Sequence, residues 1–168
     1  MRLLHWTLVI TVAAAWITSD RISPLHEYLG YGAGAAALTR FIWGFAGSAY
    51  ARFSQFVRSP GPTWRYLREV AAGKAPRYLG HNPLGGWMVV ALLSCVGALV
   101  FTGWLYTTDM FWGYGWLASL HGWLGWLLLI LIAFHVAGVV FTSFQHRENL
   151  VAAMFSGKKM PPEADDIS

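Results

Sequence analysis

The sequence predicts an all-α membrane protein, a four-transmembrane-helix bundle with both termini in the cytoplasm. Of its 168 residues, 56% are hydrophobic and 12% are charged, about half the charged share of a typical soluble domain. Its apolar runs are too long and continuous for barrel strands, so helices are the structures that can satisfy the backbone in lipid. Two histidines lie fourteen residues apart inside the last of these runs. Ionisable groups in a membrane span mark a functional site by default.

The first predicted span covers about residues 3–18, which is near the short limit for a crossing. A cleaved signal peptide is the alternative, because one Arg precedes an apolar run that ends in small residues. However, His5 and Trp6 fit poorly in the apolar region of a signal peptide, and Trp16 and Ile17 leave no small-x-small cleavage site. We therefore interpret this segment as a membrane span.

The other three spans are predicted at about residues 26–47, 86–106 and 117–144. The second contains closely spaced glycines and alanines, which allow close approach of another helix or of a flat ligand. The third has neither charge nor histidine, and the fourth contains no Asp, Glu, Lys or Arg. We expect one membrane domain over residues 1–146, followed by a mobile polar cytoplasmic tail at 147–168.

The basic residues predict the orientation of the spans. The long loop at residues 49–85 holds a single acid, Glu69, and the following bases: Arg52, Arg58, Arg65, Arg68, Lys74 and Arg77. Further bases lie near the termini, whereas the two opposite loops contain only Arg21. The positive-inside rule places this loop and both termini in the cytoplasm. Within the loop, residues 63–72 are expected to form a short helix that lies at the headgroup level.

Four histidines pair by depth across the predicted spans. His5 lies at the cytoplasmic start of the first span and His135 towards the cytoplasmic side of the fourth. His26 lies at the outer start of the second span and His121 near the outer end of the fourth. Fourteen residues are close to four helical turns, so His121 and His135 share one face, about 21 Å apart along the axis. The sequence thus predicts two sites, an inner one with His5 and His135 and an outer one with His26 and His121.

Two neutral imidazoles from different helices suit the axial ligation of a b-type haem, whose macrocycle supplies the other four nitrogens. A zinc or copper site would need three or four protein ligands at one point. The alternative is that these histidines make ordinary interhelical hydrogen bonds. Small residues flank two of them, with Gly122 and Gly125 near His121 and Gly138 near His135. The remaining histidines, His81 and His146, are interpreted as a loop or headgroup residue and a solvated helix-end residue.

Arg40 and Cys95 each bear on the cofactor. Arg40 follows His26 by fourteen residues, which places it on the same helical face at roughly the depth of the inner site. We predict that it pairs with a haem propionate, the alternative being that it extends to the cytoplasmic headgroups. Cys95 is the single cysteine and the chain has no Cys-x-x-Cys-His motif, which excludes an internal disulfide and covalent haem attachment.

With these residues in view, the chain resembles the di-haem membrane cytochrome b family. That family includes the bacterial cytochrome b561 proteins and the b-type anchor subunits of nickel–iron hydrogenases. The resemblance covers nearly the whole chain and is carried by the following motifs: Arg2-x-x-His5-Trp6, His26-x-x-x-Gly30, Arg40-x-x-Trp43-Gly44, the loop Gly80-His81-Asn82-Pro83-Leu84-Gly85, His121-Gly122 and His135. It implies a four-helix core in which the first, second and fourth spans supply the haem ligands.

The resemblance also implies function. We expect two haem b groups that relay electrons between an outer-face redox protein, similar to a cytochrome c or a hydrogenase, and quinone. The expected location is the bacterial inner membrane, crossed several times, with lipids but no nucleic acid as further partners. The alternatives are a stand-alone quinone-linked oxidoreductase that acts on a small molecule such as superoxide, and a haem-free membrane anchor. No nucleophile and base are evident in the sequence, so we predict no bond-making chemistry by side chains. An electron-transfer subunit of an oxidoreductase complex is favoured over a self-sufficient enzyme.

Overall fold

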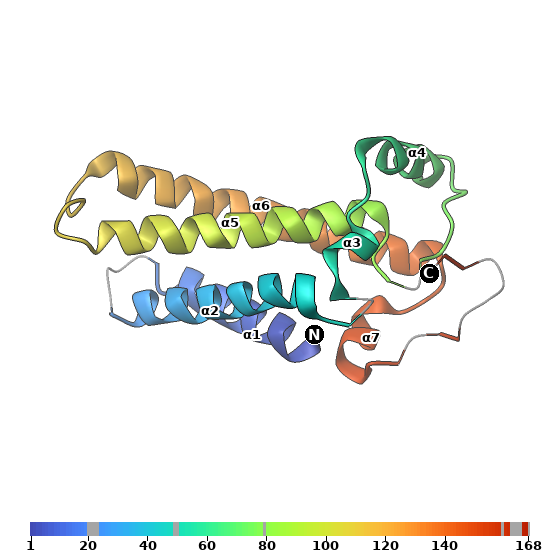
Figure 1. Cartoon of the computed structure of the whole chain (residues 1–168), viewed down its shortest axis with the longest axis horizontal. Coiled ribbons are helices and arrows are strands. Elements are labelled where there is room, and N and C mark those ends of the chain that lie inside the picture. Colours follow the sequence, from blue (N-terminus) through green and yellow to red (C-terminus); the bar gives the residue numbers. More distant parts are fainter. Residues whose placement is uncertain (20–23, 49–50, 79, 159, 162–165, 168) are drawn as a thin grey trace. The chain divides into compact units, whose positions relative to one another are not determined.

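The structure is a computed structural model, and it describes residues 1–19, 24–48, 51–78, 80–158, 160–161 and 166–167. Within these residues the regular structure is helical, and the one β-type interaction is an isolated bridge between Tyr78 and Ile167. The helices, shown in Figure 1, are α1 (Arg2–Ile17), α2 (Pro24–Ala46), α3 (Phe53–Phe56), α4 (Pro60–Ala71), α5 (Pro83–Tyr106), α6 (Gly115–Gln145) and α7 (Leu150–Ser156). The predicted all-α class is confirmed.

Each predicted span corresponds to one long helix, with boundaries that differ by a few residues at most. The largest difference is the start of α5, which begins at Pro83 instead of near residue 86. Asn82 caps this start, because its side-chain oxygen accepts a hydrogen bond from Gly85 N at 2.7 Å. Pro83 is compatible with the first helical position because it has no N–H to leave unsatisfied. The polar loop around Asn82 is therefore the N-terminal signal of α5.

Within the described part of the chain, two helices are long and apolar enough to cross a membrane, α5 with 24 residues and α6 with 31. The apolar helix α1 is shorter, with 16 residues. The 23-residue α2 is long enough, but it carries Glu27 and Arg40 and is less apolar than the other two. Length and composition thus support two of the four predicted spans, and the complete four-span topology stays a prediction.

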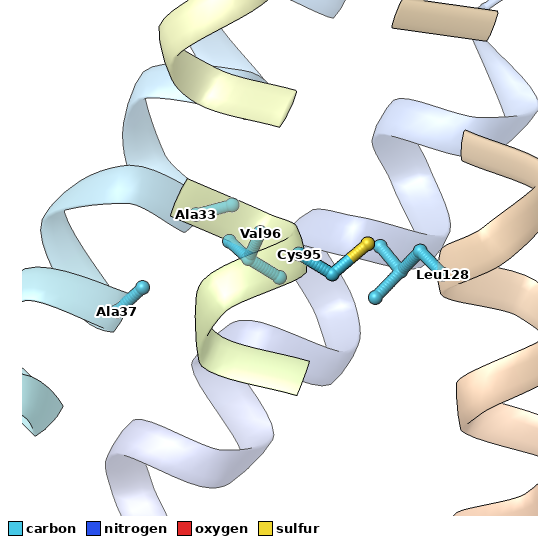
Figure 2. Packing of buried hydrophobic residues seen from close by; sticks show 5 residues of the cluster. All are labelled: Ala33, Ala37, Cys95, Val96 and Leu128. Carbon is cyan, nitrogen blue, oxygen red and sulfur yellow. The ribbon is translucent and has the colours of Figure 1, made fainter. Parts of the chain in front are cut away.

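The chain divides into two compact units. The first comprises Met1, Leu3–Ile42 and Ala91–Ile132, and the second comprises Arg2, Trp43–Val90 and Ala133–Ser168. The first unit contains most of α1 and α2 and the adjoining parts of α5 and α6. Its core is a cluster of small and aliphatic side chains, of which Figure 2 shows Ala33, Ala37, Cys95, Val96 and Leu128.

Small residues on α2 bring its backbone close to neighbouring helices in the first unit. A Cβ added to Gly34 would lie 2.9 Å from Cγ1 of Val100 on α5, which is too close for a real contact. A Cβ on Gly32 would meet Thr11 of α1 at 3.5 Å. Gly34 therefore packs against α5 and Gly32 against α1, on roughly opposite sides of α2, and such small residues allow close approach of helices in membrane bundles.

The second unit contains α3, α4, α7 and the ends of the long helices. Arg77 joins its parts, because Nη1 contacts Asp166 Oδ2 at 2.6 Å and Nη2 contacts Glu148 Oε2 at 3.2 Å. Met160, Pro161 and Asp166 therefore contact the loop before α5 through Arg77. The segment expected to be a mobile tail also contains α7, which the sequence analysis did not predict. Asn149 caps α7 by accepting a hydrogen bond from Ala152 N at 2.8 Å.

Candidate functional site

The first unit brings His26 and His121 together. His26 lies in the first turn of α2 and His121 in the second turn of α6. Their ring centroids are 6.1 Å apart and the ring planes are nearly perpendicular, at 79°. Both side chains are half-buried. The structure therefore pairs the two histidines that were predicted to form the outer site.

The main chain of α1 orients the ring of His26. Its Nδ1 lies 2.9 Å from the carbonyl oxygen of Ala15. A carbonyl oxygen can only accept a hydrogen bond, so Nδ1 carries the proton and donates it. In the neutral ring Nε2 is then the unprotonated nitrogen, and this is the tautomer in which Nε2 can bind a metal. The last turns of α1 thus select the ligating tautomer of His26.

A buried threonine on α5 orients the ring of His121 in the same way. Thr102 Oγ1 lies 3.0 Å from His121 Nδ1. The threonine is 6% exposed, and its hydroxyl donates to the carbonyl oxygen of Ala98 at 2.8 Å. Because the hydroxyl proton is used in that hydrogen bond, the hydroxyl oxygen accepts a second hydrogen bond from Nδ1–H of the imidazole. Nε2 of His121 is then the unprotonated nitrogen, which carries the lone pair. We assign this tautomer from the hydrogen-bond network.

Glycine leaves room beside the ring of His121. A Cβ on Gly103 of α5 would lie 3.2 Å from Cε1 of His121, so glycine gives this ring its space. A Cβ added to Gly30 or to Gly122 would meet no neighbouring group within 4 Å. Gly30 is half-buried and lies one turn after His26 on α2. Gly125 differs from the expectation that it makes room for a cofactor, because its Cβ position lies 3.3 Å from the ring of Trp16.

The residues present fit a haem, whose iron His26 and His121 would hold. Two imidazoles that bind one metal ion from opposite sides, each at ~2 Å through nitrogen, have centroids roughly 6 Å apart. The observed separation of 6.1 Å agrees with this value. Among the described residues, no group of three or more His, Cys, Asp or Glu side chains gathers as a metal site made by protein alone would require. A two-histidine set is sufficient only where the cofactor itself supplies the remaining ligands.

The residues predicted for the inner site are distributed over both units. His5 lies on α1 in the first unit, half-buried and edge-on to Trp6 with centroids 5.3 Å apart. His135 lies on α6 in the second unit and is also half-buried. Each is described within its own unit, so the pairing of His5 with His135 stays a prediction. Arg40 lies on α2 in the first unit and is 9% exposed, so its side chain is buried.

The two other histidines lie outside the outer site. His81 precedes α5 and is exposed, with its ring 4.8 Å from that of Phe56. His146 follows the last residue of α6 and is half-buried. Burial lowers the pKa of His146, and the nearby positive charge of Arg77 lowers it further. His146 is therefore a packed residue of the second unit, where the sequence analysis expected a solvated one.

The sequence analysis missed Thr102 and Gly103, which both contact His121. A signal for Thr102 was present, because it is a polar residue inside an otherwise apolar span. Only the packing of α5 against α6 shows that its hydroxyl faces an imidazole. No sequence rule predicts the contact from the carbonyl of Ala15, since every residue has a carbonyl.

A comparison with protein families identifies one match that covers nearly the whole chain. Residues 1–157 match the family model described as prokaryotic cytochrome b561. The matched region includes both histidines of the outer site, His5, His135 and Arg40. Neither a curated protein nor a solved structure matches the chain significantly.

Proposed function

Because the chain belongs to the prokaryotic cytochrome b561 family, and is thus a b-type cytochrome of membrane electron transfer, we propose that it binds two haem b groups. It relays electrons between a redox protein at its outer face and the quinone pool. The proposed location is a bacterial inner membrane, which the chain crosses four times with both termini in the cytoplasm. This places the outer pair of histidines, His26 and His121, on the side of the redox partner.

One observation carries the proposal, the arrangement of His26 and His121. Their ring centroids are 6.1 Å apart, and each Nδ1 is engaged by a neighbouring helix. Both Nε2 atoms are thereby left as electron-pair donors. Haem bound by these imidazoles would supply one-electron redox chemistry. The role of the chain is to hold both rings in the ligating tautomer, which favours fixed geometry and a small reorganisation during electron transfer.

The proposal of a second, inner haem rests on His5 and His135. The support comes from the sequence, since these histidines have matching depths in the predicted spans. It also comes from α6, which runs without a break from Gly115 to Gln145 and carries both His121 and His135. Fourteen residues on one continuous helix correspond to about 21 Å along its axis. Two cofactors at that spacing would form a relay across most of the apolar thickness of a bilayer.

The proposed partner surface is the connection between α5 and α6. Four of its side chains are large and well exposed: Met110 (75%), Trp112 (60%), Tyr114 (51%) and Trp116 (56%). These residues follow the end of α5 and lead into α6, a few residues before His121. Aromatic residues at this position are suited to the membrane interface or to a protein partner. We propose a periplasmic or membrane-bound redox protein, because the outer histidine pair is close to this connection in the chain.

The test is a haem count on the purified full-length chain. A pyridine haemochrome assay should give two haem b per chain. His26→Ala and His121→Ala should each leave one, with the low-spin spectrum of the remaining haem retained. His81→Ala is the matched control, because it removes an exposed histidine outside the proposed sites and should keep both haems.

Two results would contradict the proposal. Retention of two low-spin haems in both His26→Ala and His121→Ala would remove the outer site. A haem-to-protein ratio of one in the wild-type chain would remove the inner site and the relay, but it would leave the outer pair in place. Reduction of the wild-type haems by a quinol analogue in the membrane tests the quinone step separately.

A further inference from the structure

We propose that α4 is a membrane-surface helix that binds anionic phospholipid headgroups on the cytoplasmic side. The helix comprises Pro60–Ala71 and belongs to the second unit. The inference rests on the membrane location of the chain and on α5 as a membrane span, but not on haem or electron transfer. A failure of either proposal would therefore be visible separately.

One face of α4 is anchored to the protein. Tyr66 is 3% exposed and packs edge-on against Tyr78, with ring centroids 5.4 Å apart. Burial raises the pKa of Tyr66 to about 12, so the side chain stays neutral at physiological pH. Thr63 and Val70 are half-buried on the same side of the helix. The orientation of α4 about its axis is thereby fixed.

The side of α4 that is turned away from the protein is apolar and exposed. We call it the apolar face of α4 and define it as Trp64, Leu67 and Ala71, which recur at intervals of three and four residues and so share one side of the helix. Trp64 is 56% exposed and Leu67 is 39% exposed, and Ala71 is also exposed. An apolar face that is turned away from the protein on a short amphipathic helix is typical of segments that lie in a membrane interface.

Basic side chains lie near this apolar face. The guanidinium of Arg68 lies over the ring of Trp64, 5.5 Å from its centroid. Arg65, the residue after Trp64, is also exposed. Lys74 is exposed as well, and it follows Gly73, which has a φ of 68° just beyond the end of the helix. Glu69 is the one acid in α4. The surface combines an apolar face with positive charge, which is complementary to anionic headgroups rather than to zwitterionic ones.

The connection before α4 is fixed to the beginning of α5. The ring nitrogen of Trp87, in the second turn of α5, donates a hydrogen bond of 3.0 Å to the carbonyl oxygen of Arg58. The carbonyl of Phe56 lies so close to Gly86 that a Cβ at that position would collide with it. α4 begins two residues after Arg58. It is therefore held beside the end of an apolar helix, where a membrane-crossing segment meets the headgroups.

Trp87 itself supports this depth. It is 43% exposed although it lies on an apolar helix, and it combines a large ring with an N–H that is already bonded. Tryptophan is enriched at the membrane–water interface for this combination of properties. A bilayer surface at the level of Trp87 would be adjacent to α4. For this reason we propose that lipid, and not a soluble protein, binds the apolar face of α4.

The test uses an environment-sensitive probe on the full-length protein in lipid nanodiscs. Cys95→Ser removes the single cysteine and retains a group that can donate to the carbonyl of Leu124. Leu67→Cys and Pro62→Cys are then labelled with bimane as separate variants. Position 62 is exposed on the same helix but lies about 140° around the axis from position 67, so it is the matched control. Elution as a monodisperse species verifies the fold of each variant.

In nanodiscs that contain phosphatidylglycerol, the probe at 67 should shift to shorter wavelength and be quenched by lipids spin-labelled near the headgroup. The probe at 62 should stay in a water-like environment. In pure phosphatidylcholine the shift at 67 should be weaker, and Arg65→Gln with Arg68→Gln should abolish the difference between the two lipids. High salt should weaken it as well.

Three outcomes would overturn the proposal. Equal, water-like spectra at 67 and 62 in both lipids would mean that α4 does not contact the bilayer. Equal quenching at 67 in both lipids would remove the selectivity for anionic headgroups. An emission shift of the probe at 67 that occurs only when a cytosolic extract is added would mean that the apolar face of α4 binds a soluble partner.

Discussion

At the scale of single residues, the proposed outer site would depend on groups that fix imidazole tautomers. Thr102 is the most informative of these, because its hydroxyl is buried and is committed both to His121 Nδ1 and to the carbonyl of Ala98. Groups that hydrogen-bond a metal-binding histidine orient its ring and raise its basicity. Their removal leaves the ligand present but poorly directed.

We predict that Thr102→Val lowers the affinity of the outer site for haem by roughly 10- to 100-fold, as is usual for such supporting hydrogen bonds. Valine has nearly the same shape but cannot accept a hydrogen bond from the imidazole. Thr102→Ser keeps the hydroxyl and should retain most of the affinity. Haem titration of the apoprotein measures the effect. If Thr102→Ser lost as much affinity as Thr102→Val, the loss would reflect packing and not the hydrogen bond.

Arg40 gives a second prediction at this scale. Its side chain is buried on α2, fourteen residues after His26. If it pairs with a propionate of the inner haem, its charge disfavours the ferric state. At ~7 Å and an effective dielectric near ~20, the repulsion is on the order of 2 kcal/mol. For a one-electron couple this corresponds to somewhat under about 100 mV.

Arg40→Gln should therefore lower the midpoint potential of the haem assigned to His5 and His135, with little change at the outer one. Arg40→Lys should keep most of the charge effect but lose any bidentate contact. Redox titration of both haems in each variant provides the measurement. Unchanged potentials in Arg40→Gln would mean that the side chain has no part in tuning the inner site.

At the scale of elements, the residues after α6 form a cluster with the loop that precedes α5. Arg77 contacts Glu148 and Asp166, and His146 lies beside these charges. The pKa of His146 in the folded chain lies below its ordinary value of 6.5. The unfolded state therefore takes up a proton first as the pH falls, so the folded arrangement loses stability below about pH 6.5.

We expect the segment around α7 to become more accessible between pH 7.5 and pH 5.5, which hydrogen exchange with mass spectrometry can follow. His146→Gln cannot take up this proton, so its exchange should depend less on pH over the same range. Glu148→Gln is a useful comparison, because it disrupts the contact with Arg77 and should increase exchange even at pH 7.5. The expectation fails if His146→Gln and the wild-type chain respond equally to pH.

At the scale of the whole molecule, the topology is the main prediction. Two helices, α5 and α6, satisfy the length and composition of membrane spans, and α1 and α2 do so less clearly. We predict that all four cross, because the loop at 49–85 is strongly basic whereas the opposite loops are not. The connection between α5 and α6 would then face the periplasm.

Reporter fusions test this topology in cells. Green fluorescent protein fused after residue 168 should fluoresce, because it matures in the cytoplasm. Alkaline phosphatase inserted at Gly113 should be active, because it folds in the periplasm. A phosphatase insertion at Gly73, in the basic loop, is the matched control and should be inactive. An active phosphatase at Gly73 would contradict the four-span topology with both ends inside.

The sequence by itself determined the helical class, the approximate bounds of the long helices and the pairing of His26 with His121. These follow from local properties: apolar runs, the depth of a residue along a helix and the chemistry of imidazole. Short elements were harder, although Asn149 and Gly157 at the ends of α7 are recognisable cap residues.

Tertiary structure decided the contacts around His26 and His121. That Thr102 faces His121, that a carbonyl of α1 holds His26, and that Gly125 packs against Trp16 all depend on the rotation and closeness of neighbouring helices. The sequence does not contain this information locally, because almost every residue of an apolar helix is compatible with several neighbours. The choice among them is made by the close packing of α2 against α5, where glycine and alanine admit only certain approaches.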